Sequence, residues 1–330
     1  NGVEATQDIT VTLEVTDGLE LAYRANVSIP DLPVKPVPRF INEKTAITSV
    51  PGFDGIRPPL PGNIMPTGMN WDQQGKLIFT SLKGHLFRAT DTDGDGVEET
   101  LSVIQEGLAA PYGVIPDGDS LLVAHKPEVL RLTDTDGDGR ADKRDLFASG
   151  WGYTDNYHDW TCGFAKDEKG NLYVGLGSDY AQPKRPLERS RWRGAVVKIS
   201  PEGKVAPFSY GFRYPTGVAF DTKGHLFATD NQGVQNTYNE LNHLRDGFHF
   251  GVPARHETDR DAKAHPPAIQ IPHPWSRSIN GIAFIPEDLP ALAQIAGHGI
   301  GCEYDSRFLI RFTLQEVAGT MQGATYYFSK

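Results

Sequence analysis

The sequence predicts an all-β fold, a six-bladed β-propeller built from four-stranded antiparallel blades. One motif, a small residue with glycine, an apolar run, a polar turn and a second apolar run, recurs along the chain. Its spacing is close to the roughly 40–50 residues of a propeller blade. The rival α/β fold would need helices of about ten residues or more between strands, and no convincing amphipathic helix is found. These observations favour the propeller.

The repeats begin at five glycines, each heading an apolar run: Gly68, Gly113, Gly163, Gly217 and Gly281. Successive glycines are 45, 50, 54 and 64 residues apart, and the fifth copy is the weakest. Five copies, together with strands from the N-terminal segment, predict six blades. The chain reaches Lys330 directly after a strand-like run, so we expect the last blade to be incomplete and the natural protein to continue.

The first 60 residues differ in composition from the repeats. Asp8–Val15 and Leu19–Ile29 alternate as strands do, and four prolines between residues 30 and 38 are typical of an extended linker. We therefore expect residues 1–60 to form N-terminal strands and a proline-rich linker, and residues 61–330 to form the propeller.

Composition excludes several classes of function. The chain has 32 basic and 42 acidic residues, a net charge of −10, which argues against a nucleic-acid partner. No apolar run is close to the length of about 18 residues that a helix needs to span a bilayer. No positively charged leader followed by an apolar run is present, so we expect Asn1 to follow a removed signal or an artificial boundary.

The chain has two cysteines, Cys162 and Cys302, which can pair or remain two free thiols.

Two acidic loops occupy matching places in consecutive repeats. Carboxylates at positions 1, 3 and 5 with glycine at position 6 begin a calcium loop, because Ca²⁺ takes several oxygens and glycine permits the sharp turn. The first loop offers Asp91, Asp93, Asp95 and Glu99, with Ser102 at position 12. The second offers the complete set, Asp134, Asp136, Asp138, Asp142 and Asp145. The alternative is a solvated acidic turn.

These loops lie between predicted strands, so we expect Ca²⁺ to brace the structure there and to take no part in catalysis. Calcium loops and an acidic composition together favour an exported protein, periplasmic or extracellular.

A propeller gathers the loops at one end of its strands around the mouth of a central channel. Polar residues cluster at three such places: His158 before the third repeat, Asp179 after its second strand, and Arg213 with the polar run from Asp230 at the fourth. A histidine can take a proton, a carboxylate can orient it, and an arginine can stabilise developing negative charge. Each residue also has an ordinary alternative as a surface histidine, a turn cap or an ion pair.

The pattern resembles the glucose/sorbosone dehydrogenase family, six-bladed propellers that use pyrroloquinoline quinone (PQQ). Within it, the chain looks closest to domains described as membrane-bound dehydrogenases and abundant in planctomycetes. The resemblance covers roughly residues 61–300 and is most specific over residues 212–253. It is carried by His158, Tyr173–Asp179, Phe212–Gly217, Asp230–Gly233, Asn239–Asn242 and Gly247–Pro253.

The resemblance implies a PQQ-dependent sugar or alcohol dehydrogenase. In that role His158 is the general base, Asp179 orients it, and Arg213 binds the quinone or the substrate oxygen. Asn231, Gln232 and Gly233 bind the cofactor, and the last two offer backbone carbonyls to its Ca²⁺. The implied partners are a small-molecule or glycan substrate and an electron acceptor such as a cytochrome c domain.

The chain departs from the family pattern at Tyr214, which replaces Asn, at Asn239, which replaces Asp, and at residues 157–160. The cations that clamp the quinone's carboxylates are not identifiable from sequence, and Arg277, Arg307 and Arg311 are candidates. Two other functions stay open. One is a non-catalytic, calcium-braced propeller that binds a carbohydrate or a protein, and the other is a calcium-dependent hydrolase or lyase.

Overall fold

The computed structural model describes residues 43–154, 156, 159–178, 186–231, 238–253 and 263–329, and the backbone of residues 9–14 and 20–25. The chain divides into two compact units, Asn1–Phe40 and Ile41–Lys330. In the first unit, β1 (Ile9–Glu14) pairs with β2 (Glu20–Ala25) in an antiparallel hairpin, as the alternating residues predict.

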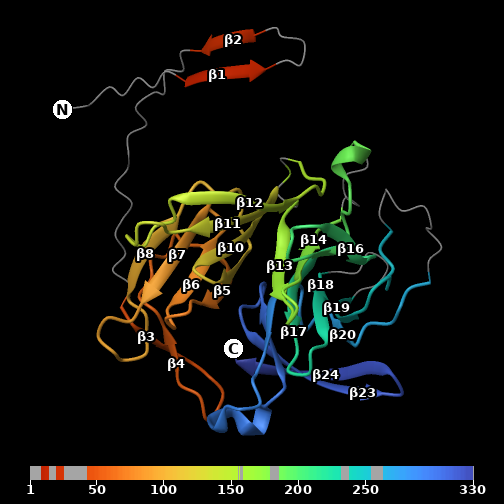
Figure 1. Ribbon diagram of the computed structural model, residues 1–330. Helices are drawn as coiled ribbons and strands as arrows, with labels where there is room; N and C mark the ends of the chain where they lie inside the picture. The colour runs from red at the N-terminus through yellow and green to blue at the C-terminus, as the bar shows by residue number, and fades with distance from the viewer. Residues whose placement is uncertain are drawn as a thin grey trace. The chain divides into compact units, whose positions relative to one another are not determined.

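The second unit confirms the predicted all-β propeller, with five antiparallel four-stranded sheets among the described residues (Figure 1). The first blade holds β5 (Pro66–Trp71), β6 (Leu77–Ser81), β7 (His85–Thr90) and β8 (Thr100–Gln105). The second holds β9 (Gly113–Asp117), β10 (Ser120–His125), β11 (Glu128–Thr133) and β12 (Lys143–Ser149). The third holds β13 (Thr161–Lys166), β14 (Leu172–Leu176), β15 (Val196–Ile199) and β16 (Val205–Ser209).

The fourth blade holds β17 (Pro215–Phe220), β18 (Leu226–Asp230), β19 (Tyr238–Leu244) and β20 (Ile269–Pro272). The fifth holds β21 (Ile279–Phe284), β22 (Gly299–Glu303), β23 (Leu309–Val317) and β24 (Thr320–Ser329). Two short 3₁₀ helices, η1 (Leu187–Arg189) and η2 (Pro290–Ile295), lie in connections. Each blade is a meander in which consecutive strands pair.

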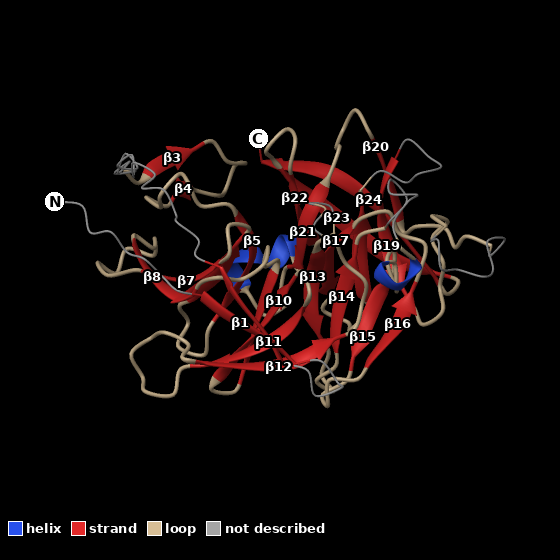
Figure 2. Cartoon of the chain, turned by 90° about the horizontal axis from the view of Figure 1, so that it is seen from above, coloured by secondary structure: helices blue, strands red, loops and turns tan. Residues whose placement is uncertain are grey.

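The blades are arranged in a ring, which Figure 2 shows from above. The first strands of successive blades adjoin in the order β5, β9, β13, β17 and β21. The sixth position is taken by a two-stranded sheet, β3 (Thr45–Ile47) with β4 (Gly55–Arg57). Its segment meets the first blade through Lys44 and Asp93, and the fifth blade through the rings of Phe53 and Phe328, 5.1 Å apart.

The core consists of apolar layers between neighbouring blades. Ile78 and Leu86 of the first blade share one buried cluster with Val114 and Val123 of the second. Equivalent clusters join the second blade to the third, the third to the fourth, and the fourth to the fifth. Burial of these alternating side chains, worth roughly 25 cal/mol per Å² of apolar surface, is the main term holding the blades together.

The repeated glycines stand where the innermost strands approach one another. A Cβ on Gly113 would lie 2.5 Å from the Cβ of Phe164, and one on Gly163 would lie 2.4 Å from Cγ2 of Val218. A Cβ on Gly281 would meet nothing within 4 Å, because no complete blade follows the fifth among the described residues. The sequence repeat therefore marks close contact between blades.

The position between the fifth and first blades holds no complete blade among the described residues, and the first strand of the first blade is correspondingly exposed. Met69 and Trp71 on β5 are 68% and 55% exposed, whereas Val114, one repeat later, is only 3% exposed. Val114 is covered by the preceding blade, and Met69 faces a position where the described residues supply two short strands.

We predict that Gly113→Ala lowers the free energy of unfolding by about 1–3 kcal/mol, the usual cost of overpacking, because the new methyl group would collide with Phe164. Gly281→Ala is the matched control, and we expect it to change stability by less than about 0.5 kcal/mol. Urea denaturation of both variants measures the difference. Equal losses would show that the glycines are not contact points between blades.

Candidate functional site

Strand direction brings Arg213 and Asn231, two of the predicted site residues, to one end of the propeller, here called the mouth face. It is the end where the first strand of each blade begins and the second strand finishes. Arg213 lies just before β17, and Asn231 follows β18 directly, so both are at this face. His158, Asp179, Gln232 and Gly233 lie outside the described residues.

A buried carboxylate joins Arg213 to Asn231. Asp230, the last residue of β18, is 1% exposed, and its carboxylate accepts the backbone N–H groups of Arg213 at 2.9 Å and Tyr214 at 2.5 Å. Burial raises the pKa of Asp230 to about 7, although these two N–H groups lower it. Arg213 Nη1 in turn donates to the carbonyl of Asn231 at 3.1 Å. Two predicted cofactor-binding residues are thus brought together.

Asn231 presents an oxygen atom that fits a cofactor or metal. Its Nδ2 donates to Ser278 Oγ at 2.9 Å, while its Oδ1 is buried and has no hydrogen-bond partner among the described residues. A buried amide oxygen without a donor is costly, and amide oxygens are good Ca²⁺ ligands. The amide oxygen suits a cation, and the guanidinium that donates to the backbone carbonyl of the same residue suits an anionic group.

The other polar residues of the predicted motif are held in structural contacts. Asn239 Nδ2 donates to the carbonyl of Ser276 at 2.5 Å, and Glu240 is buried directly across the strand pair from Asp230. Asn242 Nδ2 donates to Glu240 Oε2 at 3.4 Å. These contacts position the end of β18.

Of the three late arginines, Arg311 lies within a blade, its guanidinium carbon 5.1 Å from the ring centre of Tyr326. The backbone N–H of Arg277 donates to Glu303 Oε1 at 3.0 Å. Arg307 has a positive φ of 60° in the connection between β22 and β23. The described contacts single out none of them as a quinone clamp.

Three aromatic rings cluster at the mouth face. Tyr112, Trp160 and Tyr214 each lie just before the first strand of a blade. Tyr112 stacks on Trp160 with ring centroids 5.1 Å apart, and Trp160 meets Tyr214 edge-on at 5.8 Å. Burial raises the pKa of both tyrosines, so they stay neutral. Tyr214, where the family has Asn, is therefore part of an aromatic wall.

A fully buried arginine supports this wall, and sequence reasoning missed it. Arg193 donates from Nε to the carbonyl of Gly177 at 2.6 Å, from Nη1 to Gly152 at 3.2 Å and from Nη2 to Trp160 at 3.0 Å. It ties the connection between β12 and β13 to the connection between β14 and β15. The polar stretch around it is typical of a surface loop, so the sequence carried no signal for its burial.

The two acidic loops lie at the opposite end of the strands, between β7 and β8 and between β11 and β12. In the second, the carboxylate of Asp134 accepts the N–H groups of Gly137 at 2.7 Å and Gly139 at 2.8 Å. Asp134, Asp136 and Asp138 bring one oxygen each to within 4.8 Å of one another. This arrangement suits a hard cation such as Ca²⁺.

The first loop repeats the turn, since Asp91 accepts the N–H groups of Gly94 and Gly96, both at 2.7 Å. Its converging carboxylates are Asp91, Asp93 and Glu99. The position-9 carboxylates act as turn caps: Glu99 accepts the N–H of Thr92 at 2.7 Å, and Asp142 that of Thr135 at 2.8 Å. Asp145 lies in β12 and pairs with Lys143 at 2.8 Å, so it is not among the converging groups.

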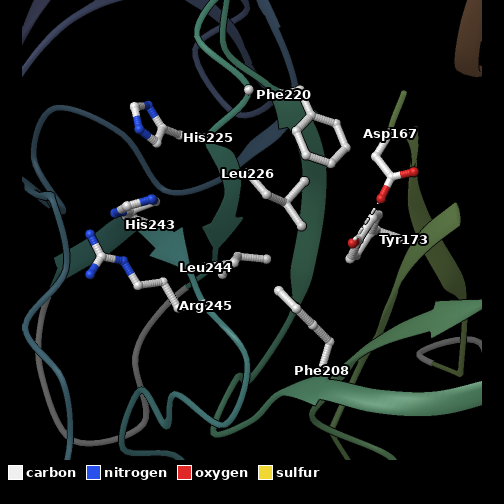
Figure 3. A pocket seen from close by; sticks show the side chains of 10 residues that line it. Asp167, Tyr173, Phe208, Phe220, His225, Leu226, His243, Leu244 and Arg245 are labelled. Atoms are coloured by element: carbon white, nitrogen blue, oxygen red, sulfur yellow. Dashed lines mark hydrogen bonds between the residues drawn. The ribbon is translucent and has the colours of Figure 1, made fainter. Parts of the chain in front are cut away.

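A cavity of about 470 Å³ lies between the third and fourth blades, also at this far end (Figure 3). Tyr173 donates to Asp167 on one side of it, at 3.2 Å, and His225 and His243 lie on the other. Burial, together with Arg245 nearby, lowers the pKa of His243 to about 4. The cavity does not include the predicted site residues.

Both cysteines are free, Cys162 buried and Cys302 exposed, so the two thiols do not form a disulfide. No helix among the described residues is long and apolar enough to cross a membrane.

A family model described as "Domain of unknown function (DUF7133)" matches residues 64–280. Comparison with curated proteins gave no match. Among solved structures, the PQQ-bound aldose sugar dehydrogenase of Streptomyces coelicolor is 18% identical, with a TM-score of 0.60 and 86% of each chain covered.

The holo pyranose dehydrogenase PQQ domain of Coprinopsis cinerea is 15% identical, with a TM-score of 0.60 and coverage of 82% of this chain and 80% of that one. The calcium structure of the Trichoderma reesei carbohydrate-active enzyme family AA12 is 13% identical, with a TM-score of 0.66 and 87% of each chain covered. These likenesses confirm the resemblance to sugar dehydrogenases at the level of the fold. Closeness to planctomycete domains stays a prediction.

We predict that Asp230→Asn changes how stability depends on pH. The folded pKa of Asp230 is raised, so the folded state binds more protons than the unfolded state between about pH 4 and pH 7, and stability from this group is lost as pH rises through that window. Asparagine does not ionise. As the pH rises from 5 to 8, the free energy of unfolding of the variant should therefore increase by about 1–4 kcal/mol relative to that of the parent, as measured by urea denaturation. Parallel curves for the two proteins would contradict a raised pKa.

Proposed function

The chain belongs to the DUF7133 family, and we propose that it is a PQQ-dependent dehydrogenase that oxidises a hydroxyl group of a sugar or another alcohol. The proposal is carried by one observation at the mouth face: buried Asp230 accepts the backbone N–H of Arg213, and the Arg213 guanidinium donates to the carbonyl of Asn231. The side-chain Oδ1 of Asn231 has no hydrogen-bond partner among the described residues. The similarity of the fold to sugar dehydrogenases supports it.

The residues present fit the cofactor at the positions that are described. Arg213 would bind a carboxylate or carbonyl oxygen of PQQ, and Asn231 would supply an amide oxygen to the accompanying Ca²⁺. Gln232 and Gly233 would add backbone carbonyls. When bound, PQQ supplies the two-electron acceptor that takes a hydride from the substrate carbon.

The protein's own residues would manage the substrate and its proton. His158 would accept the hydroxyl proton at a ring nitrogen, and Asp179 would hold the ring in the correct tautomer. Trp160, the half-buried ring of the wall, would contact the apolar face of the substrate, and the buried rings of Tyr112 and Tyr214 would hold it in place. Arg193 would act as a positioning residue, because it fixes the loop that carries Trp160.

The acidic loops would have a separate, structural task. We propose that Ca²⁺ bound there braces the blade ends, in a protein that works outside the cytoplasm and passes electrons to an acceptor such as a cytochrome c domain. The second loop is better placed than the first to hold two blades together. The backbone N–H of Ala141, at the end of this loop, donates to the carbonyl of Ile104 in the first blade at 2.8 Å.

A second function is favoured by the aromatic wall. Tyr214 adds a buried ring where the sugar dehydrogenase pattern has Asn, and the half-buried Trp160 that it contacts suits carbohydrate binding without chemistry. In that case the propeller would bind a glycan and no quinone.

Titration of the metal-free chain with PQQ and Ca²⁺ distinguishes the dehydrogenase from the glycan-binding propeller. We expect saturable binding, seen in the quinone absorbance and as a rise in melting temperature, together with reduction of a dye in the presence of aldoses. No binding at high micromolar PQQ, while Ca²⁺ alone still raises the melting temperature, would rule out the dehydrogenase and favour the glycan-binding propeller.

Two substitutions separate binding from chemistry. His158→Ala should retain PQQ binding and lose dye reduction by about 100-fold or more, because the hydroxyl proton has no acceptor. Arg213→Met should weaken PQQ binding by about tenfold or more, while Arg57→Met, a change on the exposed strand β4, should leave it unchanged. Binding titrations and dye assays on the same preparations measure both. Unchanged affinity in Arg213→Met would remove Arg213 from the site.

A further inference from the structure

The two acidic loops are nearly identical in local structure, which makes them a natural comparison. In both, the first aspartate caps the turn through two glycine N–H groups, and the position-5 carboxylate accepts the N–H two residues on: Asp95 that of Val97 and Asp138 that of Arg140. Each loop has carboxylates at positions 1, 3, 5 and 9. Within the loops they differ at position 9, Glu99 against Asp142, and at position 12, Ser102 against Asp145.

A further difference comes from outside the loops and is a lysine. Lys44 Nζ lies 2.5 Å from Asp95 Oδ2 and 3.1 Å from Asp93 Oδ2, so one ammonium group bridges positions 3 and 5 of the first loop. No lysine or arginine in the described part of the chain forms an ion pair with Asp134, Asp136 or Asp138.

The sets of converging carboxylates also differ between the two loops. In the second loop the oxygens of positions 1, 3 and 5 converge, whereas in the first loop positions 1, 3 and 9 converge and Asp95 is absent from the group. Asp95 is the residue with the shortest contact to Lys44. The ammonium thus contacts the position-5 carboxylate of the first loop, whereas the position-5 carboxylate of the second loop, Asp138, is one of its three converging groups.

We propose that Lys44 is a built-in cation of the first loop and decides which loop takes Ca²⁺. The inference rests on the proposed calcium role of the loops and adds an order of filling: the second loop binds first, and the first binds only when Lys44 is displaced. A divalent ion entering between Asp93 and Asp95 must break both ion pairs and repel the ammonium beside it.

The position of Lys44 gives this competition a structural consequence. Lys44 directly precedes β3, and its side chain ties the two-stranded β3–β4 sheet to the first blade. Filling the first loop would release that tie, so high Ca²⁺ would loosen residues 45–57 while it braces the blades.

Calorimetric titration of the chelator-treated chain with Ca²⁺ tests the order of filling. Asp136→Asn silences the second loop, so that the first is measured alone, with and without Lys44→Met. We expect Lys44→Met to tighten Ca²⁺ binding to the first loop by about tenfold or more. Lys143→Met, which removes another loop-end lysine paired with an aspartate, is the matched control and should leave the affinity within about twofold.

Amide hydrogen exchange supplies a second readout. In the parent chain, Ca²⁺ high enough to fill the first loop should speed exchange over residues 45–57, and in Lys44→Met exchange should be fast without Ca²⁺. If the second loop binds Ca²⁺ but Lys44→Met changes neither affinity nor exchange, Lys44 is not the built-in cation, while the calcium function stands. If neither loop binds Ca²⁺ in any variant, the proposed calcium role fails and this inference fails with it.

Discussion

Close approach of the innermost strands at the repeated glycines is the constraint on which the rest of the propeller depends. With no Cβ at Gly113 or Gly163, the first strand of one blade can contact the first strand of the next. That contact fixes the blades around a common axis and leaves each interblade layer free to pack apolar side chains. Because each blade repeats the same meander from its innermost strand, the corresponding loops of the blades gather at a shared end.

The repeat made the fold predictable, because the glycine and the alternating strands are backbone and burial requirements visible in local sequence. The acidic loops were predictable for the same reason, since a calcium turn is a local pattern. Contacts between distant segments were not. Lys44 reaches Asp93 across 49 residues, and Arg193 takes its acceptors from Trp160, Gly152 and Gly177, and nothing local in the sequence marks either.

At the mouth face, too, the residues could be predicted from the sequence but the contacts between distant segments could not. Arg213 and Asn231 were predicted from a resemblance, and the structure adds the reason they meet: Asp230 ends a buried strand and holds the backbone N–H of Arg213. Tyr214 was predicted only as a departure from the family pattern. Its place in a wall with Tyr112 and Trp160 depends on three blades converging, a geometry that spacing within one blade does not contain.

Strand direction separates two possible roles of calcium in this molecule. The acidic loops follow the third strand of their blades, and Arg213 and Asn231 flank the first and second strands of another, so the two sets lie at opposite ends of the sheets. A Ca²⁺ ion in either loop therefore cannot be the ion that accompanies a quinone at the mouth. Calcium bound by the loops acts on stability, and any calcium needed for catalysis must use oxygens of the mouth face, of which Asn231 Oδ1 is the described candidate.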